Sequence, residues 1–462
     1  MTAIFHEVYG PAGRAAPNGR VPARRRPQRG PRRAPPRGSG GRESDTVLGR
    51  WVATQAVNLN RHAASLRPFS YTEFGTGPAA PSRAHIDAVN RFIGEFRHRL
   101  GNGAAWVDAA AAVAVRHPAS ANLTRLLRRK DTVTSQVFYA EGIWDFYFDL
   151  FVQRLSALGE RLRAVDRIGA NCYEDLYLGL GTARPAPRLL PFSYASAGFS
   201  PLTYRRGVPL QRLRRHPNLF PLVILPQHRL DNVWALSSVL HEVSHNLQAD
   251  LGLWEVMPRL IFERLTGDGQ LPPQVAAVWA RWHKEIAADM FALLLGGPAT
   301  VESLMDVVGR SPRATVRYTQ GGVHPTPVLR VPINLILLRR LGFGPTAAAI
   351  AAAWRRLYPA VTPADVPPWL TRTFGRAAEL TVDTIVFTPR PQLAGRALAQ
   401  LVEFGPSQMA LIEQAAGRIA SGEDAGSIPP RLMISAARRA LDQHLASPQT
   451  ITDNFYRILG RR

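Results

Sequence analysis

The sequence has few of the features that mark secreted or membrane proteins. Cys172 is the single cysteine in 462 residues, which excludes an intrachain disulfide and is typical of a reducing compartment. No stretch reaches about 18 uninterrupted apolar residues, because Arg339, Arg340 and Pro345 break the nearest run, residues 333–354. The N-terminus also lacks the charged and apolar segments of a secretory signal. We expect a cytoplasmic protein without a transmembrane segment, with delivery elsewhere only by a non-classical route through its N-terminal tail.

Lysine is also scarce. Lys130 and Lys284 are the two lysines, so arginine carries nearly all of the formal net charge of +23. Residues 1–42 contain ten Arg and one acidic residue, a net of +9, which leaves +14 for the remaining 420 residues. That charge could favour an acidic partner, but no series of basic and aromatic residues accompanies it. We therefore expect no stably bound nucleic acid in the core.

Composition divides the chain into four regions. Residues 1–44 are rich in Arg, Pro and Gly and have almost nothing to bury, which predicts a disordered tail. The tail is either a solvated segment or a tether that binds a partner or an acidic surface. Residues 45–170 predict a helical N-terminal region, residues 171–345 a core that contains strands, and residues 346–462 a helical C-terminal region. The fold class that we expect is α+β and mostly helical.

Local patterns place several elements. Ser82 is a suitable helix cap before a stripe of apolar residues: Ile86, Val89, Phe92, Ile93 and Phe96. Residues 134–168 predict a long helix whose aromatic side chains are core. Residues 188–210 and 220–226 predict strands, of which the first is more polar and better suited to an exposed sheet edge. A further helix is expected to begin with Asp231 as its cap.

The stretch VLHEVSHNLQAD, residues 239–250, contains the pattern His-Glu-x-x-His. His241 and His245 are four residues apart, so on a helix their rings project from one face. Two neutral imidazoles at this spacing can reach one zinc ion at about 2.0–2.1 Å. Glu242 lies about 100° round the helix, where it can take a proton from a zinc-held water and pass it to a leaving amine. A structural pair of histidines is the alternative, because the pattern also arises by chance.

A catalytic zinc needs a third protein ligand and an open position for water. A third histidine six residues after His245 would stand at position 251, where the chain has Leu251. Asp250 is close in sequence, but on a continuing helix it turns away from the metal. The third ligand must therefore come from another part of the chain.

Glu285 and Asp289 are the candidates that follow. They lie four residues apart on an apolar helical pattern, where two carboxylates are costly to bury unless something positive lies opposite. Glu285 could bind the zinc, and Asp289 could accept the second ring N–H of a ligand histidine. The alternative is an exposed acid pair, or a salt bridge to Arg281 or Lys284.

The segment VHPTPVLR adds a third element. His324 precedes a proline, so it is expected in an extended or turn segment before a helix that begins near Val331. A loop imidazole there could face the metal and stabilise an oxyanion. Equally, Arg330 could pair with one of three carboxylates and hold the site together: Glu242, Glu285 or Asp289.

In this order, HEVSH, EIAAD and HPTPVLR resemble the motifs of the gluzincin metallopeptidases. The resemblance is closest to the group containing the type I CAAX prenyl endopeptidases and the membrane heat-shock zinc peptidases, and it covers residues 241–330. It implies a zincin-like core with a small mixed sheet and an active-site helix, and one zinc per chain. It also implies zinc ligands at His241, His245 and Glu285, a general base at Glu242, an outer partner at Asp289, and pocket residues at His324 and Arg330.

The chain departs from this group in two respects. Ser244 stands where the group often has glycine, and no membrane-spanning pattern is found. We therefore expect a soluble zinc endopeptidase that acts on a protein or peptide substrate, with zinc as its cofactor. The alternatives are a catalytically inactive zincin-fold scaffold with a structural or vestigial zinc site, and a zinc-independent protein that associates with DNA through its charge.

Overall fold

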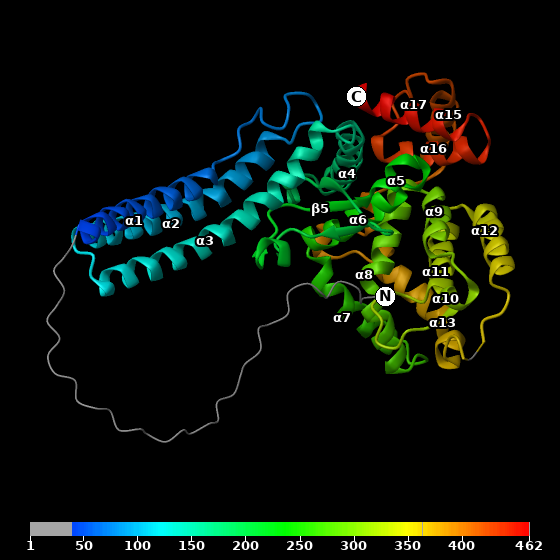
Figure 1. Cartoon of the computed structure of the whole chain (residues 1–462). Coiled ribbons are helices and arrows are strands. Elements are labelled where there is room, and N and C mark those ends of the chain that lie inside the picture. Colours follow the sequence, from blue (N-terminus) through cyan, green and yellow to red (C-terminus); the bar gives the residue numbers. More distant parts are fainter. Residues whose placement is uncertain (1–38, 363, 462) are drawn as a thin grey trace.

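The computed structural model describes residues 39–362 and 364–461. A long arm of three helices projects from a broader body (Figure 1). The arm consists of α1 (Ser39–Ser65), α2 (Arg83–Arg116) and α3 (Ser120–Val152). Residues 1–44 were predicted to form a disordered tail, and residues 1–38 of that segment lie outside the described residues. The helix α1 begins at Ser39, which is inside the predicted tail.

The start of α2 confirms the predicted cap. Ser82 is extended, and its hydroxyl accepts a hydrogen bond from the backbone N–H of His85. This bond satisfies one of the donors that a helix start leaves without an intrahelical partner. The predicted apolar stripe forms part of the arm's core, with all five residues buried: Ile86, Val89, Phe92, Ile93 and Phe96. Aromatic residues of α3 pack in the same core: Phe146, Tyr147 and Phe151 are buried, and Trp144 and Phe148 are partly buried.

The helix predicted over residues 134–168 is interrupted. The helix α3 ends before a turn in which Ser156 is extended, and α4 (Gly159–Leu180) follows. Gly159 is required at this turn, because a Cβ there would lie 2.3 Å from the carbonyl oxygen of Arg154. The break lets the chain leave the arm and enter the body.

A three-stranded sheet lies between the two hydrophobic cores. Its strands are β1 (Phe192–Ser196), β2 (Leu202–Tyr204) and β5 (Leu222–Pro226). The central strand β5 pairs in parallel with β1 and antiparallel with β2, which leaves β2 at an edge. Leu222 packs in the arm's core, whereas its neighbour Val223 packs in the body's core, because successive side chains of a strand point to opposite faces. Both predicted strand segments are thus confirmed. A separate two-stranded sheet pairs β3 (Pro209–Leu210) with β4 (His216–Pro217).

The predicted helix start at Asp231 is wrong. The helix α5 (Gln227–Asp231) ends there, and after a short 3-10 turn the motif helix α6 (Ser237–Asp250) begins. The carboxylate of Asp231 forms an ion pair with Arg161 of α4 instead of capping a helix. Asp231 therefore does not act as a helix cap.

Helices make up most of the remaining body. They are α7 (Leu253–Thr266), α8 (Pro273–Gly296), α9 (Ala299–Val308), α10 (Pro312–Val316), α11 (Pro327–Arg340), α12 (Gly344–Leu357), α13 (Pro368–Val382), α14 (Leu398–Leu401), α15 (Pro406–Ser421), α16 (Met433–Asp442) and α17 (Pro448–Arg461). The fold is α+β and mostly helical, as predicted. Within residues 39–362 and 364–461, no helix combines the length and apolar character needed to cross a membrane.

The helix α8 ends at a glycine that the packing requires. Gly297 has φ 74° and ψ −157°, a conformation open essentially to glycine, and a Cβ there would lie 2.0 Å from the ring of Phe404. Gly181 has a similar backbone, with φ 61° and ψ −143°, but its Cβ would meet nothing within 4 Å. We expect Gly297→Ala to lower the free energy of unfolding by about 1–3 kcal/mol more than Gly181→Ala, because overpacking costs that much. Urea denaturation measures both, and equal losses would contradict the contact with Phe404.

Candidate metal centre

The helix α6 carries the His-Glu-x-x-His motif at the centre of the body. Its apolar residues are fully buried and lie in the core shared with α4 and α8: Val239, Leu240, Val243 and Leu247. Their burial fixes the rotation of the helix, so His241 and His245 both face α8. Asp250 turns away from them, as predicted, and bonds to Tyr173 and Arg206.

Side-chain atoms of α6 and α8 that could bind a metal ion lie close together. The Nε2 atoms of His241 and His245 are 3.1 Å apart, Oε2 of Glu285 lies 3.4 Å from the first, and Oε1 of Glu285 lies 3.5 Å from the second. A tetrahedral zinc ion with ligands at 2.0–2.1 Å would separate them by about 3.3 Å. Both the spacing and the donor types therefore suit zinc, and the three residues form a group that can hold a metal ion.

Asp289 lies one turn beyond Glu285 on the same face of α8. Its Oδ1 is 2.9 Å from Nδ1 of His241, so the other ring nitrogen of that histidine is left facing the ligand group. Nδ1 of His245, by contrast, is buried and has no hydrogen-bond partner among the described residues. The structure thus supplies an orienting carboxylate to one of the two histidines.

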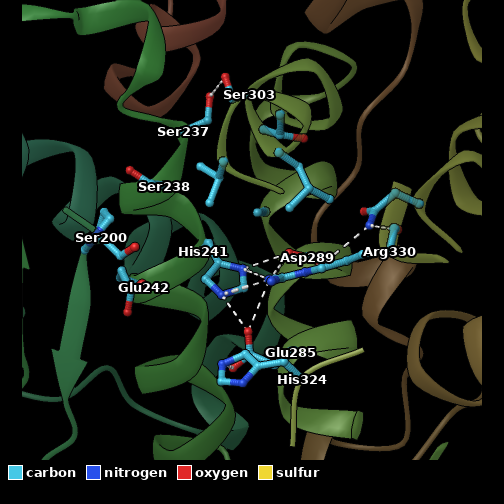
Figure 2. A pocket seen from close by; sticks show the side chains of 16 residues that line it. Ser200, Ser237, Ser238, His241, Glu242, Glu285, Asp289, Ser303, His324 and Arg330 are labelled. Atoms are coloured by element: carbon cyan, nitrogen blue, oxygen red, sulfur yellow. Dashed lines mark hydrogen bonds and ion pairs between the residues drawn. The ribbon is translucent and has the colours of Figure 1, made fainter. Parts of the chain in front are cut away.

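Arg330 reaches both carboxylates from α11 (Figure 2). Its Nε lies 2.6 Å from Oδ2 of Asp289, and its Nη2 lies 2.9 Å from Oδ1 of Asp289 and 3.2 Å from Oε2 of Glu285. In the part of the chain that the structure describes, neither Arg281 nor Lys284 forms an ion pair with these acids. Arg330 therefore supplies the positive charge that two buried carboxylates need.

His324 lies in the turn before α11. Its Nε2 is 3.4 Å from Oε1 of Glu285, and its side chain is 64% exposed, so it stands on the solvent side of the ligand group. The helix begins at Pro327 rather than near Val331, which corrects the prediction. Proline is favourable at the first helical position, where its missing N–H would have no intrahelical acceptor.

Comparisons with known proteins identify no relative of this chain. No protein-family model matches it, no curated protein matches it, and no solved structure matches it. What can be said of the site therefore comes from the three motifs and from the side-chain geometry around them.

Glu242 lies beside the ligand group and is nearly buried. Together with Ser200 and Pro201 it lines the adjoining cavity, and its carboxylate has no hydrogen-bond donor among the described residues. Burial raises the pKa of Glu242 to about 7, although the charge of His241 opposes the shift. A carboxyl group with such a pKa can both accept and release a proton near neutral pH.

The two motif histidines differ in proton affinity. Burial lowers the pKa of His241, but its hydrogen bonds to Asp289 and Glu285 outweigh burial and raise the pKa to about 10. Burial and the neighbouring charge of His241 lower the pKa of His245 to about 3. Without a metal, a proton on His241 balances the carboxylates, and a metal ion at the same point would displace that proton.

A cavity of about 250 Å³ opens beside the ligand group, and several of its residues were not predicted. Its lining includes small hydroxyl side chains on α6 and α9: Ser237, Ser238, Thr300 and Ser303. Asn334 also lines it, and its Nδ2 lies 3.4 Å from Oδ2 of Asp289. Its position four residues after Arg330 was a sequence signal that could have identified it. The hydroxyl residues carried no such signal, because two helices that are distant in the sequence, α6 and α9, bring them together.

Proposed function

We propose that this chain is a zinc-dependent endopeptidase of the gluzincin type, with a zincin-like core and a cytoplasmic location. One observation carries the proposal: the ligating atoms of His241, His245 and Glu285 meet at the spacing of a zinc site, and the nearly buried Glu242 adjoins them. The order of the three sequence motifs supports it. The proposed substrate is a protein or peptide.

Each site residue has a role in peptide hydrolysis. A zinc ion, when bound, would lower the pKa of a water molecule and polarise the scissile carbonyl. Glu242 accepts a proton from the attacking water and passes it to the leaving amine. Asp289 and Arg330 hold His241 and Glu285 in position. His324, on the solvent side, donates a hydrogen bond to the carbonyl oxygen as negative charge develops there.

The edge strand β2 is positioned to bind an extended substrate. It pairs with β5 on one side, and Asn246 of α6 donates a hydrogen bond to the hydroxyl of Thr203 at 2.6 Å, so the strand lies against the motif helix. Ser200 and Pro201, which precede β2, line the cavity. A peptide that added to this edge would therefore pass the ligand group in extended form.

The metal site is tested by removing its proposed third ligand. We expect the wild-type chain to bind about one zinc, and Glu285→Ala to bind zinc at least a hundredfold more weakly. Loss of an outer-shell partner alone costs about 10–100-fold, and loss of a direct ligand costs more. Elemental analysis after dialysis, followed by competition with a zinc chelator, measures both.

Glu160→Ala is the matched control, because Glu160 is exposed and lies on α4, outside the ligand group. It should bind zinc as the wild type does. Unchanged zinc affinity in Glu285→Ala would show that the third ligand is assigned wrongly. Stoichiometric zinc in a wild-type protein that hydrolyses no peptide would instead favour the inactive scaffold.

A further inference from the structure

Two cationic side chains lie over the ring of a tryptophan beside the candidate metal centre. Trp254, near the start of α7, meets His245 edge to face, with ring centroids 5.9 Å apart. The guanidinium of Arg205 lies 3.6 Å from the centroid of the Trp254 ring, and the ammonium of Lys284 lies 4.5 Å from it. Lys284 immediately precedes Glu285 on α8, so this cluster borders the ligand group directly.

These two cations lack a carboxylate partner. Among the described residues, no acid lies within ion-pair distance of Arg205 or Lys284, although both are partly buried. Burial lowers the pKa of Arg205, and the charge of the exposed Glu255 opposes that shift from beyond ion-pair distance. The aromatic face compensates the cations in part. An anion that reached them would gain charge-assisted hydrogen bonds.

The path of an extended substrate leads to this cluster. Arg205 directly follows Tyr204, the last residue of β2, whereas Ser200 and Pro201 at the other end of the strand line the cavity. The distances through Trp254 place the guanidinium within about 10 Å of the His245 ring, which an extended peptide spans in about three residues at 3.3 Å each. Beyond the residues of the site itself, the cavity lining contributes uncharged hydroxyls, whereas Arg205 and Lys284 add positive charge at the other end of β2.

We propose that Arg205 and Lys284, held over Trp254, form a subsite for a carboxylate of the peptide bound at the metal centre. The substrate class is thus peptides with an acidic group about three residues from the cleaved bond. That carboxylate is either an Asp or Glu side chain or a free carboxyl terminus. The inference rests on the proposed function, and the net charge of +23 agrees with it, because such a field attracts acidic peptides.

Peptide binding tests the subsite without requiring turnover. The protein is the zinc-loaded full chain carrying Glu242→Gln, and the probes are three fluorescent alanine–leucine peptides. One has blocked ends and two central glutamates, the second has glutamines in their place, and the third has no acidic side chain but a free carboxyl terminus. We expect one or both carboxylate peptides to bind about tenfold more tightly than the glutamine peptide. Which of them does so identifies the source of the carboxylate.

Variants assign the preference to the cluster. Adding Arg205→Gln or Lys284→Gln should reduce the carboxylate preference, the pair together should abolish it, and Arg205→Lys should retain most of it. Arg116→Gln removes an equal charge from the end of α2, an exposed position on the arm, and should leave the preference unchanged.

The outcomes separate this inference from the proposed function. Equal binding of all three peptides, or a preference that survives the double variant, overturns the carboxylate subsite and leaves the endopeptidase proposal intact. If no peptide binds and the wild-type protein cleaves none in a mixed peptide library, the proposed function fails and the subsite fails with it.

Discussion

Glu242→Gln is expected to lower the rate of peptide hydrolysis by about 10²–10⁴-fold, the usual contribution of general acid–base catalysis, while about one zinc per chain stays bound. Glutamine keeps the size and hydrogen-bonding capacity of the side chain but cannot take up the proton of the attacking water. Because Glu242 is outside the ligand group of His241, His245 and Glu285, the substitution removes the base and leaves the metal site.

Two measurements on the same preparation check this result. Mass spectrometry of a proteome-derived peptide library gives the rate at which new ends appear, and elemental analysis gives the zinc content. Glu160→Gln replaces an exposed acid on α4 and should match the wild type in both. Undiminished cleavage in Glu242→Gln would sink the assignment of the base. Loss of zinc in that variant would place Glu242 among the ligands instead.

Arg330→Met is expected to lower the free energy of unfolding of the metal-free protein by about 3–5 kcal/mol. Removing one partner of a buried ion pair leaves an uncompensated buried charge, and the cost is of that size. Here the arginine side chain is 11% exposed, and its removal would take from the buried Asp289 and Glu285, at 5% and 13%, a cation that contacts both and leave them His241, which also contacts both. Methionine retains most of the volume of the arginine side chain, so the loss of unfolding free energy reflects mainly the removed positive charge.

Arg340→Met is the matched control, because it removes an arginine from the same helix. Arg340 pairs with Asp383 at 3.2 Å, and both side chains are more than a third exposed, so a loss of only about 1 kcal/mol is expected. Urea unfolding in the presence of a chelator measures both variants. If Arg330→Met lost no more stability than Arg340→Met, Arg330 would not be compensating the buried acids. Added zinc should recover part of the loss, since a cation at the ligand group also neutralises Glu285.

Features that depend on one or two helical turns were predictable from the sequence. The cap at Ser82 needs only the backbone N–H of His85, three residues away, and the structure has it. The spacing of His241 and His245 likewise requires only that the segment be helical. The strand over residues 220–226 was identifiable because a run of apolar residues between prolines suits a buried central strand.

Features that depend on distant partners were not predictable in the same way. Asp231 is a good cap by local preference, but in the structure its carboxylate pairs with Arg161, seventy residues earlier in the chain, and the helix starts at Ser237. The long aromatic helix breaks near Ser156 because the chain must pass from the arm into the body. The sequence around Asp231 does not identify Arg161 as its partner, and the sequence around Ser156 does not show the direction that the chain takes after α3.

The sequence by itself determined which side chains could hold a metal ion: two imidazoles four residues apart and, farther along, two carboxylates four residues apart. Only the tertiary structure decided that Glu285 faces both histidines, that Arg330 lies against the same carboxylates, and that Arg205 and Lys284 each lie over the ring of Trp254. The physical reason is that helical periodicity fixes the face on which a residue lies. The burial of apolar surface between α6, α8 and α11 fixes which faces meet.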